Sequence, residues 1–269
     1  MKWIKTVGPT VLDGTTSTKI GGANFKLPAD AKCLLAIIPH ISSPAGLTAG
    51  QAVTASVELK SDSNPLMPYK VLCAPIGSTL GKAGISVQDK APIYPVNCPV
   101  KGGSEIEIYG TGLIDHTIEP YVTVDLVIAD FVATPQFKAK IGTLTTMGAV
   151  TAGETKGSGI RLEGGKKIVE VCGYAIGTTV ATLKGICGKF RLSSSGFKGM
   201  GDIELAVENI GGAVSIDATT ATSIEFAHLT RRGDLEVPIT SPIDIDDYFN
   251  LGVALSTVGK FIVGLLYNQ

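Results

Sequence analysis

Charged and aromatic side chains are both scarce in this sequence. Charged residues make up 17% of the 269 residues and aromatic residues 6%, whereas about 25% of the residues in soluble proteins are charged. The net charge of -1 removes the electrostatic footprint of a nucleic-acid-binding protein, so we expect no sequence-specific nucleic-acid partner. So little charge is typical of subunits that cover one another, or of a thermophilic or Gly/Ser/Thr-rich β protein with an uncharged surface.

Long hydrophobic runs are missing as well. No apolar stretch approaches the ~18 residues of a membrane-spanning helix, and Met1 to Thr6 lack the apolar core of a signal peptide. We therefore expect the chain to assemble in a cytoplasm without being secreted by a signal peptide. The five cysteines form no CxxC pair, which favours reduced, buried thiols.

The usual motifs of catalysis and metal binding are also absent. The three histidines, His40, His116 and His228, have no metal-ligand spacing, and neither G-x-S-x-G nor GxGxxG occurs. We expect no enzyme and no cofactor, and we assign the histidines to surface or turn positions. One acidic cluster, Asp244, Asp246 and Asp247, is a candidate for Ca²⁺, which prefers carboxylate oxygens. The competing interpretation is a solvent-facing strand edge.

One segment of the sequence occurs twice. Residues Pro99 to Tyr109 and Pro238 to Tyr248 share a proline, a β-branched residue, two acids that flank an isoleucine, and a tyrosine at the same spacing. The isoleucines are Ile106 and Ile245. Two copies half a chain apart indicate a duplicated domain, because a stacked array would use at least three shorter units.

Short apolar runs separated by turn residues occupy both halves in the same order. Phe25 to Leu27 matches Ile160 to Leu162, and Lys32 to Ile37 matches Lys167 to Cys172. Strands about every 8–12 residues, without a helical apolar period, are typical of β-sandwiches and barrels. We predict an all-β chain of two tandem antiparallel sandwiches of jelly-roll type, residues 1–135 and 136–269. An immunoglobulin-like sandwich is the alternative.

Two sets of residues are candidates for contacts with partners. Lys2 and Lys5 flank Trp3 and Ile4, which suggests either a short arm against a subunit, a membrane or an inner surface, or a frayed terminus. Exposed tyrosines would form the aromatic platform of a carbohydrate- or ligand-binding module; the candidates are Tyr94, Tyr109, Tyr121, Tyr174 and Tyr248.

The arrangement of tandem jelly rolls without a visible active site resembles that of the double jelly-roll major capsid proteins of icosahedral viruses. The resemblance is architectural, covers the whole chain and rests on no family-specific motif. It implies a structural coat protein of a virion that forms homotrimers, assembles into a shell, and contacts other virion proteins. The alternatives are a carbohydrate- or ligand-binding sandwich and a bicupin-like enzyme, whose clustered metal ligands we do not find.

Overall fold

Every strand pairing in the described part of the chain is antiparallel. The computed structural model describes residues 1–42, 52–64, 67–78, 86–88, 90–113, 119–147, 153–179, 188–199, 201–207, 224–251 and 259–268. Within these ranges no helix has the length and apolar character needed to cross a membrane. The predicted all-β class is confirmed.

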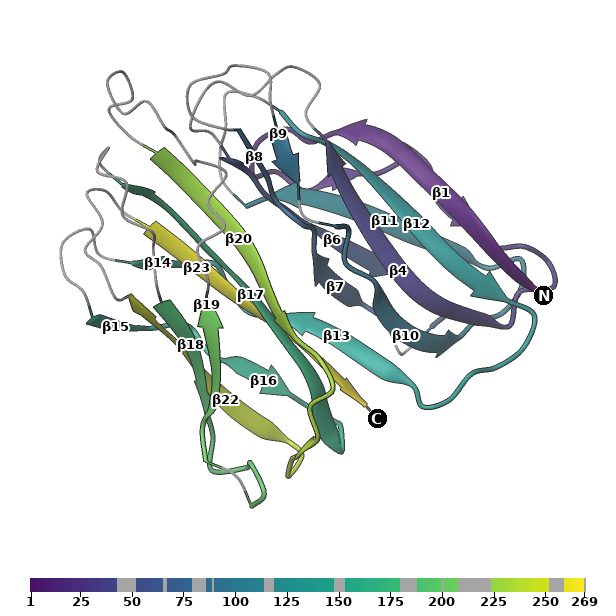
Figure 1. Cartoon of the computed structure of the whole chain (residues 1–269). Coiled ribbons are helices and arrows are strands. Elements are labelled where there is room, and N and C mark those ends of the chain that lie inside the picture. Colours follow the sequence, from purple (N-terminus) through teal and green to yellow (C-terminus); the bar gives the residue numbers. More distant parts are fainter. Residues whose placement is uncertain are drawn as a thin grey trace.

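The first half of the chain forms a sandwich of two sheets (Figure 1). One sheet has four strands, in the order β1 (Lys2–Val11), β12 (Tyr121–Ala129), β4 (Cys33–Ser42) and β10 (Tyr94–Pro99). The other has five, with β2 (Thr18–Lys19) and β3 (Phe25–Lys26) both beside β11 (Glu105–Gly112), followed by β6 (Ala55–Lys60) and β7 (Tyr69–Leu72). A small third sheet consists of β5 (Ala52–Val53), β8 (Ile76–Ser78) and β9 (Ser86–Gln88).

The second half repeats the two large sheets. Its first sheet runs from β13 (Phe137–Ile141) and β14 (Thr145–Met147) through β23 (Gly259–Asn268) and β17 (Lys167–Thr179) to β20 (Ile224–Arg232) and β21 (Val237–Pro238). Its second sheet runs from β15 (Gly153–Lys156) and β16 (Ile160–Leu162) through β22 (Ile243–Leu251) and β18 (Gly188–Ser193) to β19 (Ile203–Val207).

Both halves have the strand order of a jelly roll. The strands of the two large sheets occupy eight positions in each half when β2 with β3, β13 with β14, β15 with β16 and β20 with β21 each count as one and the small third sheet is left out. Numbered along the chain, one sheet of each half has the order 1-8-3-6 and the other 2-7-4-5. We call these the 1-8-3-6 sheet and the 2-7-4-5 sheet of each sandwich. Eight antiparallel strands connected in this way form two Greek keys, which define the jelly roll.

The repeated segment forms strand 7 in both sandwiches. Ile106 pairs with Phe25 and Ile245 with Ile160, while Tyr109 pairs with Lys19 and Tyr248 with Lys156. Each isoleucine is buried. The duplication inferred from these residues is therefore confirmed in the strand pairing.

The expected match of Lys32–Ile37 with Lys167–Cys172 is wrong by one position. An irregularity in strand pairing interrupts strand 3 of both sandwiches at the same place, opposite Val127 in the first and Leu266 in the second. Counted from it, Ile37, opposite Leu126, corresponds to Val171, opposite Leu265. The alternation of strand side chains explains the difference, because the shift moves Cys172 to the outer face of its sheet.

Alternating apolar side chains build one core inside each sandwich. Along β12, the residues Val122, Val124, Leu126 and Ile128 are fully buried, whereas those between them are more exposed. The second core contains three aromatic rings in contact, Phe190, Phe249 and Phe261, with centroids 5.0 to 6.3 Å apart.

The N-terminal residues do not form a free arm or a frayed end. They lie in β1, which pairs with β12 from Lys2 opposite Ala129 to Val11 opposite Tyr121. Trp3 packs against the first core. Because side chains alternate along a strand, Ile4 lies on the opposite face of the sheet, and it is 65% exposed.

The boundary between the sandwiches at residues 135 and 136 stays a prediction. Every pairing among the described strands joins two strands on the same side of that point. Figure 1 shows β13 crossing from the first half to the second beside the first sandwich.

Candidate assembly surfaces

The outer face of the 1-8-3-6 sheet of the second sandwich is buried against the first sandwich. Cys172, Tyr174, Ile262 and Leu266 lie on this face, each at most 4% exposed, and join the hydrophobic cluster of the first sandwich rather than that of the second. The alternate residues on these strands belong to the second core. This sheet is apolar on both faces, and its outer face forms the contact between the sandwiches.

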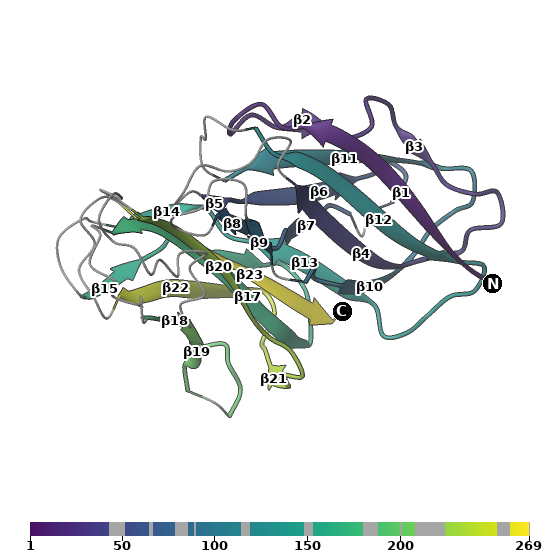
Figure 2. The ribbon, with the colours of Figure 1, turned by 45° about the horizontal axis from the view of Figure 1, so that its top comes forward.

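The first sandwich meets this face with its edge strands. Strand β13 contacts both β7 and β10, which are strands 5 and 6 of the first jelly roll. Ala139 and Ile141 on β13 are 6% and 8% exposed and lie in the shared cluster. The Asn97 side chain also donates a hydrogen bond to the carbonyl oxygen of Pro135 over 2.8 Å. Strand 1 of the second sandwich, β13, thus covers the edge between β7 and β10, which are strands 5 and 6 of the first (Figure 2).

An ion pair lies in the same contact. Arg231 Nε donates to Glu170 Oε1 over 2.6 Å, and its second guanidinium nitrogen donates to the carbonyl oxygen of Ile93 over 3.0 Å. The guanidinium carbon lies 4.7 Å from the ring centroid of Tyr94, whose hydroxyl donates to the carbonyl oxygen of Leu72 over 2.9 Å. Glu170 is 8% exposed. Because its charge is buried, this network fixes the relative placement of the two sandwiches.

The equivalent face of the first sandwich is only partly covered by the described part of the chain: Ile4 is 65% exposed, Val127 is half-buried and Ala36 is 8% exposed. Its row Ile4–Val127–Ala36 corresponds to the buried row Ala139–Leu266–Glu170 of the second sandwich.

A polar row lies beside this apolar one. Thr6 Oγ1 donates to Asp125 Oδ1 over 2.6 Å, and His40 Nε2 lies 2.9 Å from Asp125 Oδ2. The side chain of His40 is 41% exposed. This surface therefore combines an apolar row that is exposed at Ile4 with an ordered polar row.

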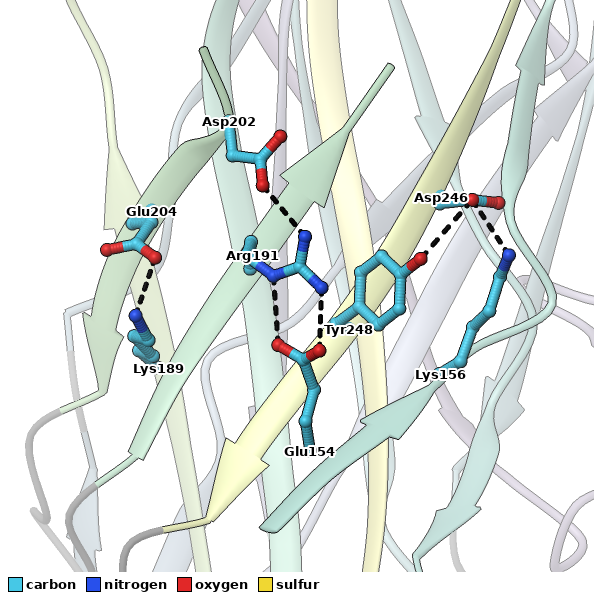
Figure 3. Close-up of polar contacts among 8 residues, drawn as sticks. All are labelled: Glu154, Lys156, Lys189, Arg191, Asp202, Glu204, Asp246 and Tyr248. Atoms are coloured by element: carbon cyan, nitrogen blue, oxygen red, sulfur yellow. Dashed lines mark hydrogen bonds and ion pairs between the residues drawn. The ribbon is translucent and has the colours of Figure 1, made fainter.

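Charge gathers instead on the outer faces of the 2-7-4-5 sheets. On the second sandwich, Arg191 lies over the ring of Tyr248, with its guanidinium carbon 3.9 Å from the centroid (Figure 3). It donates to both carboxylate oxygens of Glu154, over 2.9 and 2.6 Å, and to Asp202 over 2.7 Å. Such forked pairing fixes a planar guanidinium.

The two repeated tyrosines sit in matching charged surroundings. Lys156 donates to Asp246 over 2.7 Å, and the hydroxyl of Tyr248 donates to the same carboxylate over 3.3 Å. In the first sandwich, Lys19 donates to Glu107 over 3.0 Å and Tyr109 donates to it over 3.2 Å. Each lysine lowers the pKa of its acid by this hydrogen bond. Both acids are therefore ionised and satisfied at neutral pH.

The three aspartates predicted as a calcium candidate do not converge. Asp244 pairs with Arg161 and Asp246 with Lys156 on the outer face, but Asp247 points into the core and is 1% exposed. The described residues contain no group of three or more His, Cys, Asp or Glu side chains placed to hold a metal ion. The solvent-facing interpretation, made for the pair Asp244 and Asp246, fits their positions, whereas Asp247 points to the other side of the strand.

The remaining predicted residues are dispersed. His40 lies within β4 rather than in a turn, His116 lies outside the described residues, and only the backbone of His228 is described. Tyr94 and Tyr174 are buried between the sandwiches, whereas Tyr109, Tyr121 and Tyr248 are half-buried on three separate strands. These five side chains therefore do not form one platform.

From the sequence, Asp247 was not identified as a buried carboxylate. Its Oδ1 accepts a hydrogen bond from the Gly159 backbone over 2.7 Å, and its Oδ2 has no described partner. Burial raises its pKa. The same backbone hydrogen bond joins Ile20 to Ile108 in the first sandwich and Gly157 to Asp247 in the second. The two pairs are therefore equivalent, and the first sandwich has Ile108 where the second has Asp247. The alternation of Ile243, Ile245 and Phe249 was the signal that places Asp247 inward.

A cleft of about 520 Å³ opens beside the contact between the sandwiches. Phe137, Val169, Leu235 and Leu266 supply its apolar lining. Its polar side chains include Asp234 and the paired Lys167 and Glu236.

The sequence matches no family model and no curated protein. Solved structures overlap nearly the whole chain at low identity. The major capsid protein P2 of bacteriophage PM2 is 12% identical, with 100% of this chain and 98% of that chain covered and a TM-score of 0.36. PNGase F, a glycosylasparaginase from Flavobacterium meningosepticum, is 9% identical, with 98% and 96% covered and a TM-score of 0.39. The VP2 subviral particle of infectious bursal disease virus is 10% identical, with 100% and 72% covered and a TM-score of 0.27. All these TM-scores are below 0.5.

Proposed function

We propose that this chain is a structural, self-assembling coat protein of a virus particle. Its stable unit is a homotrimer in which six similar sandwiches form a ring, and trimers pack further into a closed shell. Other virion proteins are its additional partners. The proposal needs no catalytic residue and no cofactor, and it uses the surfaces between sandwiches as the functional sites.

The observation that carries the proposal is the unequal use of equivalent faces. The second sandwich buries the outer face of its 1-8-3-6 sheet on the edge of the first, whereas in the described part of the chain the first sandwich leaves Ile4 exposed on its own equivalent face. Both sandwiches have the same strand order. A second copy that repeats the internal contact would cover Ile4.

Repeating one contact in this way gives a head-to-tail interface, which closes into a ring or continues as a filament. Two sandwiches per chain make a ring of six from three chains. Permanent interfaces of this kind bury upwards of about 2,000 Å². The internal contact already shows the apolar composition that such an interface needs, with Tyr174, Ile262 and Leu266 at its centre.

The charged 2-7-4-5 faces support the same arrangement. Their side chains are paired with one another around Tyr109 and Tyr248, so they are satisfied without a partner. We place these faces on the outside of the ring, in water. Surface ion pairs of this kind contribute little to stability but keep a surface soluble.

Sedimentation equilibrium at micromolar concentration tests the proposal. A species of three times the chain mass of 27.8 kDa is the expected result, and larger closed particles should appear at higher concentration. A monomer that persists as concentration and salt are raised would overturn the proposal.

The cleft between the sandwiches favours a second candidate function, a ligand-binding module. Its volume and its apolar lining suit a small molecule or sugar, and Asp234 and Glu236 also line it. This candidate predicts a monomer that binds a glycan through the cleft. Saturable glycan binding that Phe137→Ala abolishes, together with monomeric sedimentation, would favour it over the coat protein.

A further inference from the structure

We propose that β1 of one chain docks into the groove between β19 and β20 of a neighbouring copy. This inference rests on the proposed function and names the surfaces that join one subunit to the next. It follows from comparing what surrounds strand 1 and the edge between strands 5 and 6 in the two sandwiches.

Strand 1 is covered in one sandwich and bare in the other. In the second sandwich it is β13, which lies against β7 and β10, with Ala139 and Ile141 buried. In the first sandwich it is β1, an edge strand on which Ile4 is 65% exposed. Strand pairing makes Ile4 the counterpart of Ala139, because they lie opposite Val127 and Leu266. An exposed edge strand with a large apolar residue invites a partner.

The edge between strands 5 and 6 is likewise covered in the first sandwich and open in the second. In the first sandwich β13 covers the edge between β7 and β10, and Leu72 on β7 is fully buried. In the second sandwich the equivalent edge, between β19 and β20, is a groove of about 650 Å³. Ala206, the counterpart of Leu72 by strand pairing, is exposed there.

The groove has a mixed lining of apolar, polar and charged side chains. Leu205 and Leu229 are each 8% exposed and offer apolar contact along the groove. The hydroxyl of Thr230, also 8% exposed, has no described hydrogen-bond partner. Glu204, which is paired with Lys189, lies at the same groove with Arg231 and Arg232, so the apolar side chain of Ile4 and not a lysine of β1 is the group that we dock there. Among the described strands, the exposed strand β1 and the groove between β19 and β20 thus match the two surfaces that are in contact within the chain.

Cross-linking between differently tagged copies tests this docking. Two chains are co-expressed with Cys187 replaced by Ser, one carrying Ile4→Cys and the other Ala206→Cys, and treated with a short bis-maleimide. The matched controls are pairs in which both chains carry Ile4→Cys or both carry Ala206→Cys. Sedimentation of the untreated particles is measured alongside.

The docking predicts a covalent dimer with both tags in the mixed pair and little cross-linking in either control. Equal cross-linking in the Ile4→Cys control would mean that β1 pairs with β1 about a two-fold axis, and would overturn the docking. Trimers without cross-links in the mixed pair would overturn the docking but leave the proposed function standing. Monomers would overturn both.

Discussion

At the residue scale, the most informative side chain is Asp247. It is buried at 1% exposure, with one carboxylate oxygen bonded to the Gly159 backbone and the other without a described partner. Gly157 provides the room, since a Cβ there would lie 2.2 Å from Oδ2. Burial of an ionised carboxylate costs free energy unless it is paired. The second sandwich therefore has a buried carboxyl group, whose ionisation is destabilising, where the first has Ile108.

We predict that Asp247→Asn stabilises the protein at neutral pH by about 1 kcal/mol. Because its folded pKa is raised, the folded state binds the proton more tightly, so wild-type stability falls as pH rises from the unfolded pKa through the folded one. The advantage of the variant should be full above that window and vanish toward about pH 4.

Urea unfolding of both proteins across this pH range measures the effect. Asp246→Asn is the matched control on the neighbouring, exposed position; it removes the ion pair with Lys156 and should destabilise slightly, by less than about 1 kcal/mol. An advantage of Asp247→Asn that grows on acidification would contradict the account.

The pair of Arg231 and Glu170 gives a second prediction at this scale. Arg231→Met should cost about 2–5 kcal/mol, because it leaves the Glu170 carboxylate buried without its partner. Adding Glu170→Gln should restore much of the loss, since the remaining amide carries no charge. Calorimetric unfolding of the single and double variants checks this. Equal stability of the single variant Arg231→Met and the double variant would show that the ion pair does not determine the contact between the sandwiches.

Sequence reasoning reached some of these residues and not others. The spacing of Ile106 and Tyr109 against Ile245 and Tyr248 predicted equivalent strand positions, because alternation along a strand depends only on local spacing. The ion pairs around the tyrosines depend on neighbours far along the chain, such as Arg191 and Glu154. No local sequence pattern predicts those contacts.

At the element scale, strand 1 of the first sandwich and strand 3 of the second differ most from expectation. The sequence indicated either a short arm or a frayed terminus for Lys2 to Lys5, because a strand of mixed polar and apolar residues at an edge has a weak local signal. The strand Lys167–Thr179 carries apolar residues on both faces, which is typical of a sheet buried on both sides. That feature was visible in the sequence and points to the contact between the sandwiches.

Strand β1 supplies a prediction of its own. Ile4→Asp should weaken assembly at least tenfold while leaving subunit unfolding within about 0.5 kcal/mol, since Ile4 is exposed in the single chain. Val132→Asp is the matched control, because Val132 is 55% exposed but lies outside the strands. Concentration-dependent sedimentation measures assembly; equal loss in both variants would remove the special role of β1.

At the scale of the whole molecule, the two sandwiches behave as one unit because they share a cluster. Cys172, Tyr174 and Ile262 from the second half lie in the cluster of the first. We predict that residues 136–269 alone are poorly soluble, since this face loses its cover. Co-expression with residues 1–135 should return a soluble complex, which affinity purification detects. A soluble, monomeric second half would contradict this dependence and weaken the use of the contact as a template.

The central claim is that the contact within a chain is repeated between chains until a ring closes. Cryo-electron microscopy of the purified oligomer tests it most directly, because projections down the symmetry axis count the lobes. The account predicts three-fold symmetric particles with six similar lobes around a ring. Two-fold dimers, open filaments or isolated two-lobed chains would contradict it.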